Sequence, residues 1–196
     1  MKKILLATAL LVLTGSSLAQ AKMTPSGTSG VINVPTGSVR SIGHISLGGQ
    51  AGEDGNFVGA NFSLLPGLEV AASRVNVKHG DSHNVFSSKL QILPETAVSP
   101  ALAVGVEDIG DQIDRVGYVA ITKNLPWSVK AHGGVGTGRL KNGFIALEKE
   151  LKSFTLELEY DGHDFNYGAA IPLGKFLQGE VGVRSKNAFA GVNFTF

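Results

Sequence analysis

The sequence predicts an all-β protein, an up-and-down antiparallel transmembrane β-barrel of about 12 strands. Three observations predict this fold class. Apolar and polar residues alternate with a period of two along most of the chain, which is the pattern of half-buried strands. The seven prolines lie between the alternating segments or before the first one, where they remove no ladder hydrogen bond. The links between the segments alternate between two kinds of composition.

The first 21 residues have the features of a secretory signal peptide. Lys2 and Lys3 precede an apolar stretch over 4–13, and Ala19 and Ala21 have the spacing of a small-x-small cleavage site. We therefore expect cleavage after Ala21. An uncleaved anchor helix would need about 20 apolar residues, and this stretch has roughly half that length. The expected organisation is a signal peptide over 1–21, an N-terminal segment leading into the barrel over 22–42, and the barrel itself over 43–196.

The composition excludes several classes of protein. The formal net charge of +1 becomes −1 when Lys2 and Lys3 leave with the signal peptide, so a generally basic nucleic-acid-binding protein is not expected. The chain has no cysteine, which excludes a lipid-modified N-terminal cysteine, a disulfide framework and thiolate metal sites. An exported chain without these features must be stabilised by its own core or by a membrane.

Twelve alternating segments account for the predicted strands. Each is about ten residues long with its flanks, which is the length that crosses a bilayer when a strand is tilted. In chain order they are GHISLGGQ, NFVGANFSL, LEVAASRV, VFSSKLQIL, ALAVGVED, RVGYVAITK, WSVKAHGGV, GFIALEKEL, FTLELEYD, FNYGAAI, LQGEVGVR and AFAGVNFTF.

The links between these segments form two sets that alternate along the chain. One set is mostly short or marked by proline, as in LPG at 65–67 and NLP at 124–126. The other set is charged and contains glycine, as in EDIGDQID at 107–114 and DGHD at 161–164. This alternation is expected when hairpins connect an up-and-down sheet whose two rims face different surroundings.

The two faces of the strands differ in polarity. In FTLELEYD, Leu156 and Leu158 lie on one face, and Glu157 and Glu159 lie on the other. In a soluble sandwich the apolar face forms the core, whereas in a membrane barrel it meets lipid and the charges line the lumen. The export signal, the strand length and aromatic residues near strand ends, such as Trp127, favour the membrane barrel. A secreted lipocalin-like or sandwich protein is the alternative.

The last strand ends in FAGVNFTF, with an aromatic residue at the C-terminus. Phe196, Phe194 and Gly191 resemble the C-terminal assembly signal of outer-membrane barrels, whereas Phe189 stands where that signal usually has a polar residue. We therefore expect the protein in the outer membrane of a diderm bacterium. Its expected partners there are outer-membrane lipid and the barrel assembly machinery.

Several stretches of the mature chain, taken in order, resemble the YjbH-like family of outer-membrane proteins linked to exopolysaccharide biosynthesis and export. They extend from about 27 to 196 and include GVINVPTG, PALAVGVED and the EYDG turn. The resemblance implies an envelope barrel with a polysaccharide or its export proteins as partners. Members of the family are commonly longer, with a second barrel and extra domains, whereas this chain has room for one barrel.

The inward faces of the predicted strands concentrate charged residues. The lumen-lining candidates are Lys89, Lys130, His132, Glu148, Glu150, Glu157, Glu159, Glu180 and Arg184. One interpretation is a lumen that guides a polar solute such as a saccharide. The other is a filled interior in which charges pair and fix the strands. About twelve strands lie between filled eight-stranded barrels and open sixteen-stranded pores, so the number of strands does not decide between the two interpretations. A conduit or accessory barrel and a closed structural barrel therefore remain as alternatives.

Catalytic and metal-binding interpretations have less support. Ser128 and His132 share a strand face, but no third group is evident, so a hydrolase is not expected. GVGTGR at 134–139 lacks the following helix that a phosphate site requires. HGDSH and DGHD place potential ligands of a weak divalent-cation site in exposed loops, namely His79, Asp81, His83, His163 and Asp164, but ordinary loop polarity is the better account of them. We expect no enzymatic activity, no cofactor and no metal.

Overall fold

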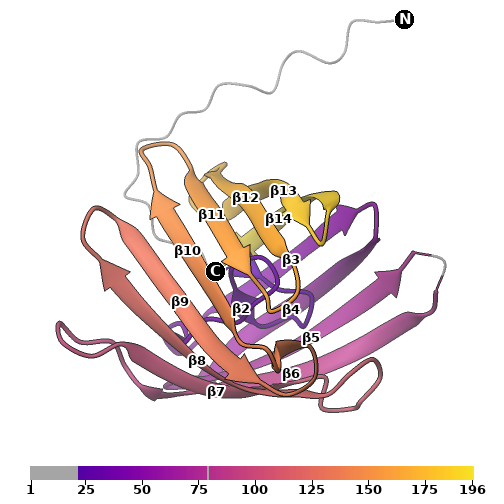
Figure 1. Ribbon diagram of the computed structural model, residues 1–196, viewed down its shortest axis with the longest axis horizontal. Coiled ribbons are helices and arrows are strands. Elements are labelled where there is room, and N and C mark those ends of the chain that lie inside the picture. The colour runs from indigo at the N-terminus through magenta and orange to yellow at the C-terminus, as the bar shows by residue number, and fades with distance from the viewer. Residues whose placement is uncertain (1–21, 79) are drawn as a thin grey trace, which may run out of the picture.

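The computed structural model describes residues 22–78 and 80–196, and the predicted signal peptide lies outside them. Twelve antiparallel strands, β3 to β14, form a closed barrel in which consecutive strands pair and β14 closes the ring onto β3 (Figure 1). The predicted fold class is therefore confirmed. The strands are β3 (Ile45–Gly52), β4 (Gly55–Leu65), β5 (Leu68–Val77), β6 (Ser82–Leu93), β7 (Ala101–Glu107), β8 (Val116–Leu125), β9 (Val129–Gly136), β10 (Phe144–Glu150), β11 (Thr155–Tyr160), β12 (Phe165–Pro172), β13 (Leu177–Arg184) and β14 (Asn187–Thr195).

The hairpin turns divide between two rims. The terminal rim, where β3 begins and β14 ends, holds the links after β4, β6, β8, β10 and β12, and the prolines of the barrel lie in or next to these links. The far rim holds the charged links, most of which contain glycine, and the 3-10 turn η1 (Gly138–Leu140). The two sets of links thus lie at opposite rims, as predicted. None of the helical structure in the described residues is long and apolar enough to cross a membrane.

The outward face of the barrel is apolar. Leu158 is 49% exposed, whereas Glu157 and Glu159 on either side of it are 5% and 1% exposed. The charged side chains that point outward from the described strands are all basic, namely Arg74, Lys123 and Lys149. Apolar residues outside and acidic residues inside are the arrangement of a membrane barrel and the reverse of a soluble sandwich.

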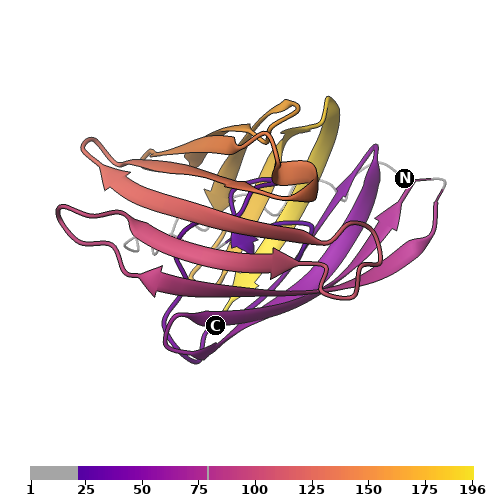
Figure 2. The same ribbon diagram turned by 60° about the horizontal axis from the view of Figure 1, so that its bottom comes forward.

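The N-terminal segment runs through the inside of the barrel. Residues 22–39, which we call the plug, include two short strands, β1 (Lys22–Met23) and β2 (Ser29–Gly30), that pair with each other. The indigo trace of this segment lies within the ring of strands in both views (Figures 1 and 2). Val31 and Val34 have no exposed surface and belong to one apolar cluster with the inward Tyr118. The plug therefore fills the lumen that the strands enclose.

The course of the plug starts and finishes toward the terminal rim. Its bends reach the far rim at Ser26 and Asn33, and the chain then returns to the start of β3. On the way back Gly37 passes directly against β8, where a Cβ atom would lie 2.7 Å from the Cα atom of Ile121. Glycine is required at this position because the plug backbone and the barrel wall are in direct contact.

We predict that Leu158→Arg lowers the free energy of unfolding by about 2 to 4 kcal/mol, because it places a charge against lipid near the middle of β11. Leu173→Arg, at the terminal rim, is the control and should cost about 1 kcal/mol or less. The measurement is urea unfolding of the barrel in lipid vesicles. Tolerance of Arg at Leu158 would contradict the assignment of this face to lipid.

Candidate functional site

The candidate functional site is the contact between the plug and the inward wall of the barrel. Strand alternation directs every second side chain into the lumen, so polar residues from several strands between β4 and β11 converge on the plug. Four of the lumen-lining candidates touch the plug or flank its lysine, and these are Lys89, Glu148, Glu157 and Glu159.

Lys22 of the plug lies between two carboxylates of the wall. Its Nζ atom donates to Glu157 and lies 3.0 Å from Oε1 of Glu148. Glu148 and Glu157 are directly opposite each other on β10 and β11. Like charges in that position destabilise a sheet, so the ammonium group of Lys22 supplies the compensation that these two strands need.

Glu159 binds the backbone of the plug. Its Oε2 atom accepts hydrogen bonds from the backbone N–H groups of Ile32, Asn33 and Val34 at 3.0, 3.0 and 3.2 Å. The side-chain amide of Asn166 donates to Oε1 at 2.7 Å. Successive N–H groups that converge on one carboxylate form an anion-binding nest, and hydrogen bonds to a charged group are about twice as strong as neutral ones. The VINV stretch of the plug is thereby fixed to β11.

A wall ion pair binds the plug at β2. Glu69 and Lys89 are directly opposite each other on β5 and β6, with 3.7 Å between Nζ and Oε1. Glu69 accepts a hydrogen bond from the backbone N–H of Ser29 at 2.8 Å, and Lys89 donates to the carbonyl oxygen of Ser29 at 2.8 Å. Both wall side chains are almost completely buried, so the pair and the plug residue satisfy one another.

Loops of the far rim close over the bends of the plug. Arg139 of η1 donates to the carbonyl oxygen of Asn33 at 2.9 Å and to the carboxylate of Glu107. Burial alone would lower the pKa of the Arg139 guanidinium, but neighbouring Glu107 raises that pKa above its usual value. The Ser26 hydroxyl also donates to Glu107, at 3.0 Å. A cavity of about 170 Å³ remains between these groups.

Asp161 fixes the second bend of the plug at the same rim. Its Oδ2 atom accepts a hydrogen bond from the side-chain amide of Asn33 at 2.9 Å. Burial would raise the pKa of the Asp161 carboxyl, but hydrogen bonds from the backbone of Asp164 and from the amides of Asn33 and Asn166 bring that pKa below its usual value. The carboxylate form is therefore the one that holds Asn33.

The remaining lumen-lining candidates contact other wall residues. Glu180 accepts hydrogen bonds from the amides of Gln50 and Asn193 at 2.7 and 2.8 Å. Arg184 donates to Gln50 at 3.0 Å and lies 3.3 Å from Asp54. These residues form a separate polar group across β13, β14 and β3.

Three further candidates lie on β9 and β10. Nδ1 of His132 lies 2.8 Å from the hydroxyl of Thr122, and its Nε2 lies 3.8 Å from Glu148. Lys130 and Glu150 are half-buried toward the terminal rim. Among the described residues, no three His, Cys, Asp or Glu side chains come together as a metal site.

Several residues that hold the plug are not among the candidates predicted from the sequence, namely Lys22, Glu69, Glu107 and Arg139. A signal for Glu69 and Glu107 was present, because both lie on the polar face of an alternating segment. No periodic signal marks Lys22, since it lies outside the barrel strands. Arg139 likewise lies in a link, where alternation gives no face.

We predict that Glu159→Gln weakens the plug, because an amide cannot accept all the N–H groups that converge on the carboxylate. The free energy of unfolding should fall by at least about 2 kcal/mol, since one hydrogen bond to a charged group contributes about 1.5 to 3 kcal/mol. Urea unfolding and protease cleavage within 22–39 are the two measurements. Glu53→Gln, in an exposed turn of the far rim, is the control and should change stability by less than about 0.5 kcal/mol. Equal protease resistance of both variants would contradict the anchoring role.

Comparison with known proteins identifies the family. A family model described as "Exopolysaccharide biosynthesis protein YbjH" matches residues 23–195. None of the curated proteins matches the chain significantly. Two similar solved structures are mutants of the porin of Rhodopseudomonas blastica, each with 15% sequence identity, a TM-score of 0.38, and coverage of 74% of this chain and 57% of the porin. The chain thus spans little more than half of those porins. Because the family match extends over nearly all of the plug and all twelve strands, the chain belongs to the YjbH family, as its sequence resemblance predicted.

Proposed function

We propose that this protein takes part in envelope or exopolysaccharide biosynthesis or export as an outer-membrane barrel closed by its own N-terminal segment. The family description supports the process, and the apolar outward face supports the membrane location. The observation that carries the closed state is the plug, which is buried in the lumen and bonded to the wall on several sides. The protein then serves as an accessory barrel and not as a permanently open pore.

The charge balance of the lumen supports the closed barrel. The strands alone have more inward glutamates than inward bases, which favours a conduit when the wall is considered without the plug. Lys22 and the backbone N–H groups of the plug bind Glu157 and Glu159, and so provide much of the missing compensation. Removal of the plug would leave buried carboxylates without partners, which is strongly unfavourable.

A conduit that opens when the plug withdraws is the second candidate function. Both ends of the plug lie toward the terminal rim, so it can leave as one unit without passing through the far rim. Many of its wall contacts are hydrogen bonds, which water or a hydroxyl-rich solute can replace.

Conductance in planar bilayers tests the closed state. We predict that the protein without its signal peptide gives no steady conductance. A variant that also lacks 22–39 should conduct, provided that heat-modifiable migration in gels shows that its barrel is folded. Steady conductance of the protein with its plug would contradict the proposal. Transient openings of that protein under applied voltage would favour the withdrawing plug over the permanently closed barrel.

The C-terminal residue allows a test of assembly in the outer membrane. The backbone of Phe196 exchanges hydrogen bonds with Ile45 at 2.9 and 3.1 Å, and its ring stacks on Phe176 with 5.8 Å between centroids. We predict that Phe196→Ala lowers the amount of heat-modifiable barrel in outer-membrane fractions while export continues, because it removes the proposed signal for the assembly machinery.

Phe176→Ala is the matched control, since it removes the ring stacking and leaves the C-terminal residue intact. An equal loss of assembled barrel in both variants would assign the effect to packing and not to a signal. Recovery of the unaltered protein in the soluble periplasmic fraction would contradict the outer-membrane location itself.

A further inference from the structure

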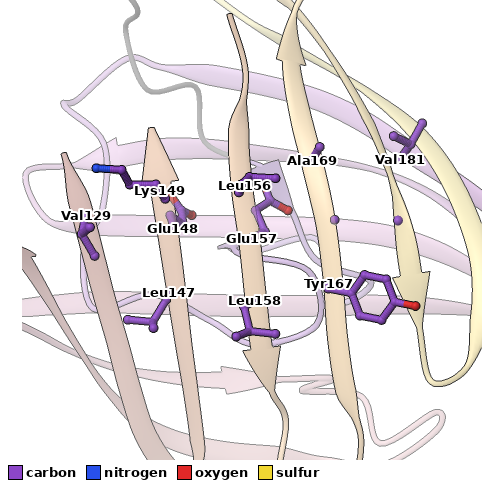
Figure 3. Close-up of a pocket in the computed structure, with 12 residues that line it drawn as sticks. Val129, Leu147, Glu148, Lys149, Leu156, Glu157, Leu158, Tyr167, Ala169 and Val181 are labelled. Atoms are coloured by element: carbon purple, nitrogen blue, oxygen red, sulfur yellow. The ribbon is translucent and has the colours of Figure 1, made fainter. Parts of the chain in front are cut away.

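The outer wall has an apolar groove across β9 to β13. The groove has a volume of about 630 Å³, and its lining includes Leu147, Leu156, Leu158, Tyr167, Ala169 and Val181 (Figure 3). These side chains are on the lipid face, whereas Glu148 and Glu157 belong to the inward set. The groove is therefore separate from the plugged lumen.

A small outward residue between larger neighbours creates the groove. Ala169 of β12 points outward and lies directly between Leu156 of β11 and Val181 of β13. Two residues closer to the far rim, the larger Leu158 of β11 and Tyr167 of β12 are directly opposite each other. The wall is consequently low around Ala169 and raised along its border, which leaves a depression with almost purely apolar walls.

A positive charge stands in the same cross-strand row as the depression. Strand register places Lys149, Leu156, Ala169 and Val181 side by side from β10 to β13. The ammonium group of Lys149 donates to the carbonyl oxygen of Trp127 in the neighbouring turn, a contact that leaves its positive charge unneutralised. The Trp127 side chain is 84% exposed, as expected of an aromatic residue at a membrane interface.

We propose that this groove binds one acyl chain of a phospholipid whose phosphate lies against Lys149. The apolar lining requires a hydrocarbon occupant, and the cation at its terminal-rim side selects an anionic head group. The inference rests on the membrane location given under the proposed function, and it adds a specific lipid site to the outer wall.

The charge pattern disfavours a second copy of the chain as the occupant. All glutamates of the described barrel strands are on the inward face, and the outward charges of those strands are basic. A second barrel therefore offers Lys149 no strand carboxylate. A lipid phosphate provides the complementary charge directly.

Native mass spectrometry of the delipidated barrel tests this site. The probes are phosphatidylglycerol and a diacylglycerol with the same chains. We predict that the protein retains one phosphatidylglycerol and binds the diacylglycerol about fivefold more weakly, because the contact between Lys149 and the phosphate is missing. Equal retention of both lipids would overturn the role of the phosphate.

Two variants test the two parts of the site. Lys149→Gln should reduce the affinity for phosphatidylglycerol about fivefold, and Ala169→Phe should reduce it by about tenfold or more because the ring fills the groove. Val181→Phe fills the same groove from β13 and replaces Ala169→Phe if that variant does not fold. Arg74→Gln and Ala72→Phe, outward changes on β5 away from the groove, are the controls and should leave binding unchanged.

The outcomes are distinct. Unchanged lipid retention in both Lys149→Gln and the folded groove-filling variant would overturn the proposal. Dimers that form in the unaltered protein and disappear in the groove-filling variant would assign the groove to a second copy instead. None of these changes touches the plug, so bilayer conductance and outer-membrane fractionation test the proposed function independently of the lipid site.

Discussion

The buried carboxylates of the inner wall are the constraint on which the rest of this structure depends. Period-two alternation places the strand glutamates inside the ring, away from lipid. A buried charge without partners is strongly unfavourable, so each carboxylate requires donors close by. Lys22 and the N–H groups around Asn33 meet that requirement for Glu157 and Glu159. The barrel and the plug are thus one hydrogen-bonded unit, and neither satisfies its polar groups alone.

The outer wall is apolar where the inner wall is polar. This difference between the two faces is related to the distribution of the links between the two rims. Outside, the strands present Leu158 and similar apolar residues, with isolated bases such as Lys149. Inside, polar side chains from many strands converge on one segment. At the far rim, charged links extend this polar interior, since Arg139 and Asp161 bind the bends of the plug. The proline-marked links at the terminal rim connect the strands with little involvement in these contacts.

The barrel could be predicted from the sequence because its signal is local. Alternation within eight residues assigns Leu158 to one face and Glu159 to the other, and hairpin order then follows from the short links. The plug could not be predicted in this way. Its N–H group at Ile32 binds a carboxylate 127 residues away, and no periodic pattern in GVINVPTG marks that partner. The lipid groove likewise depends on the register that sets the small Ala169 opposite Val181.

The position of the plug in the chain has a consequence for folding order. The plug comes first, yet Glu157 and Glu159 lie on β11, near the end of the chain. Contacts of such long sequence separation form late, because the intervening chain must lose conformational entropy before these contacts can form. The segment stays without these two carboxylates until β11 has formed, and closure of β14 onto β3 then encloses it. A barrel truncated before β11 would keep the contacts at Ser26 and Ser29 but would lack the partners of Lys22 and of the N–H groups around Asn33, so complete seating of the plug requires that synthesis and pairing have reached β11.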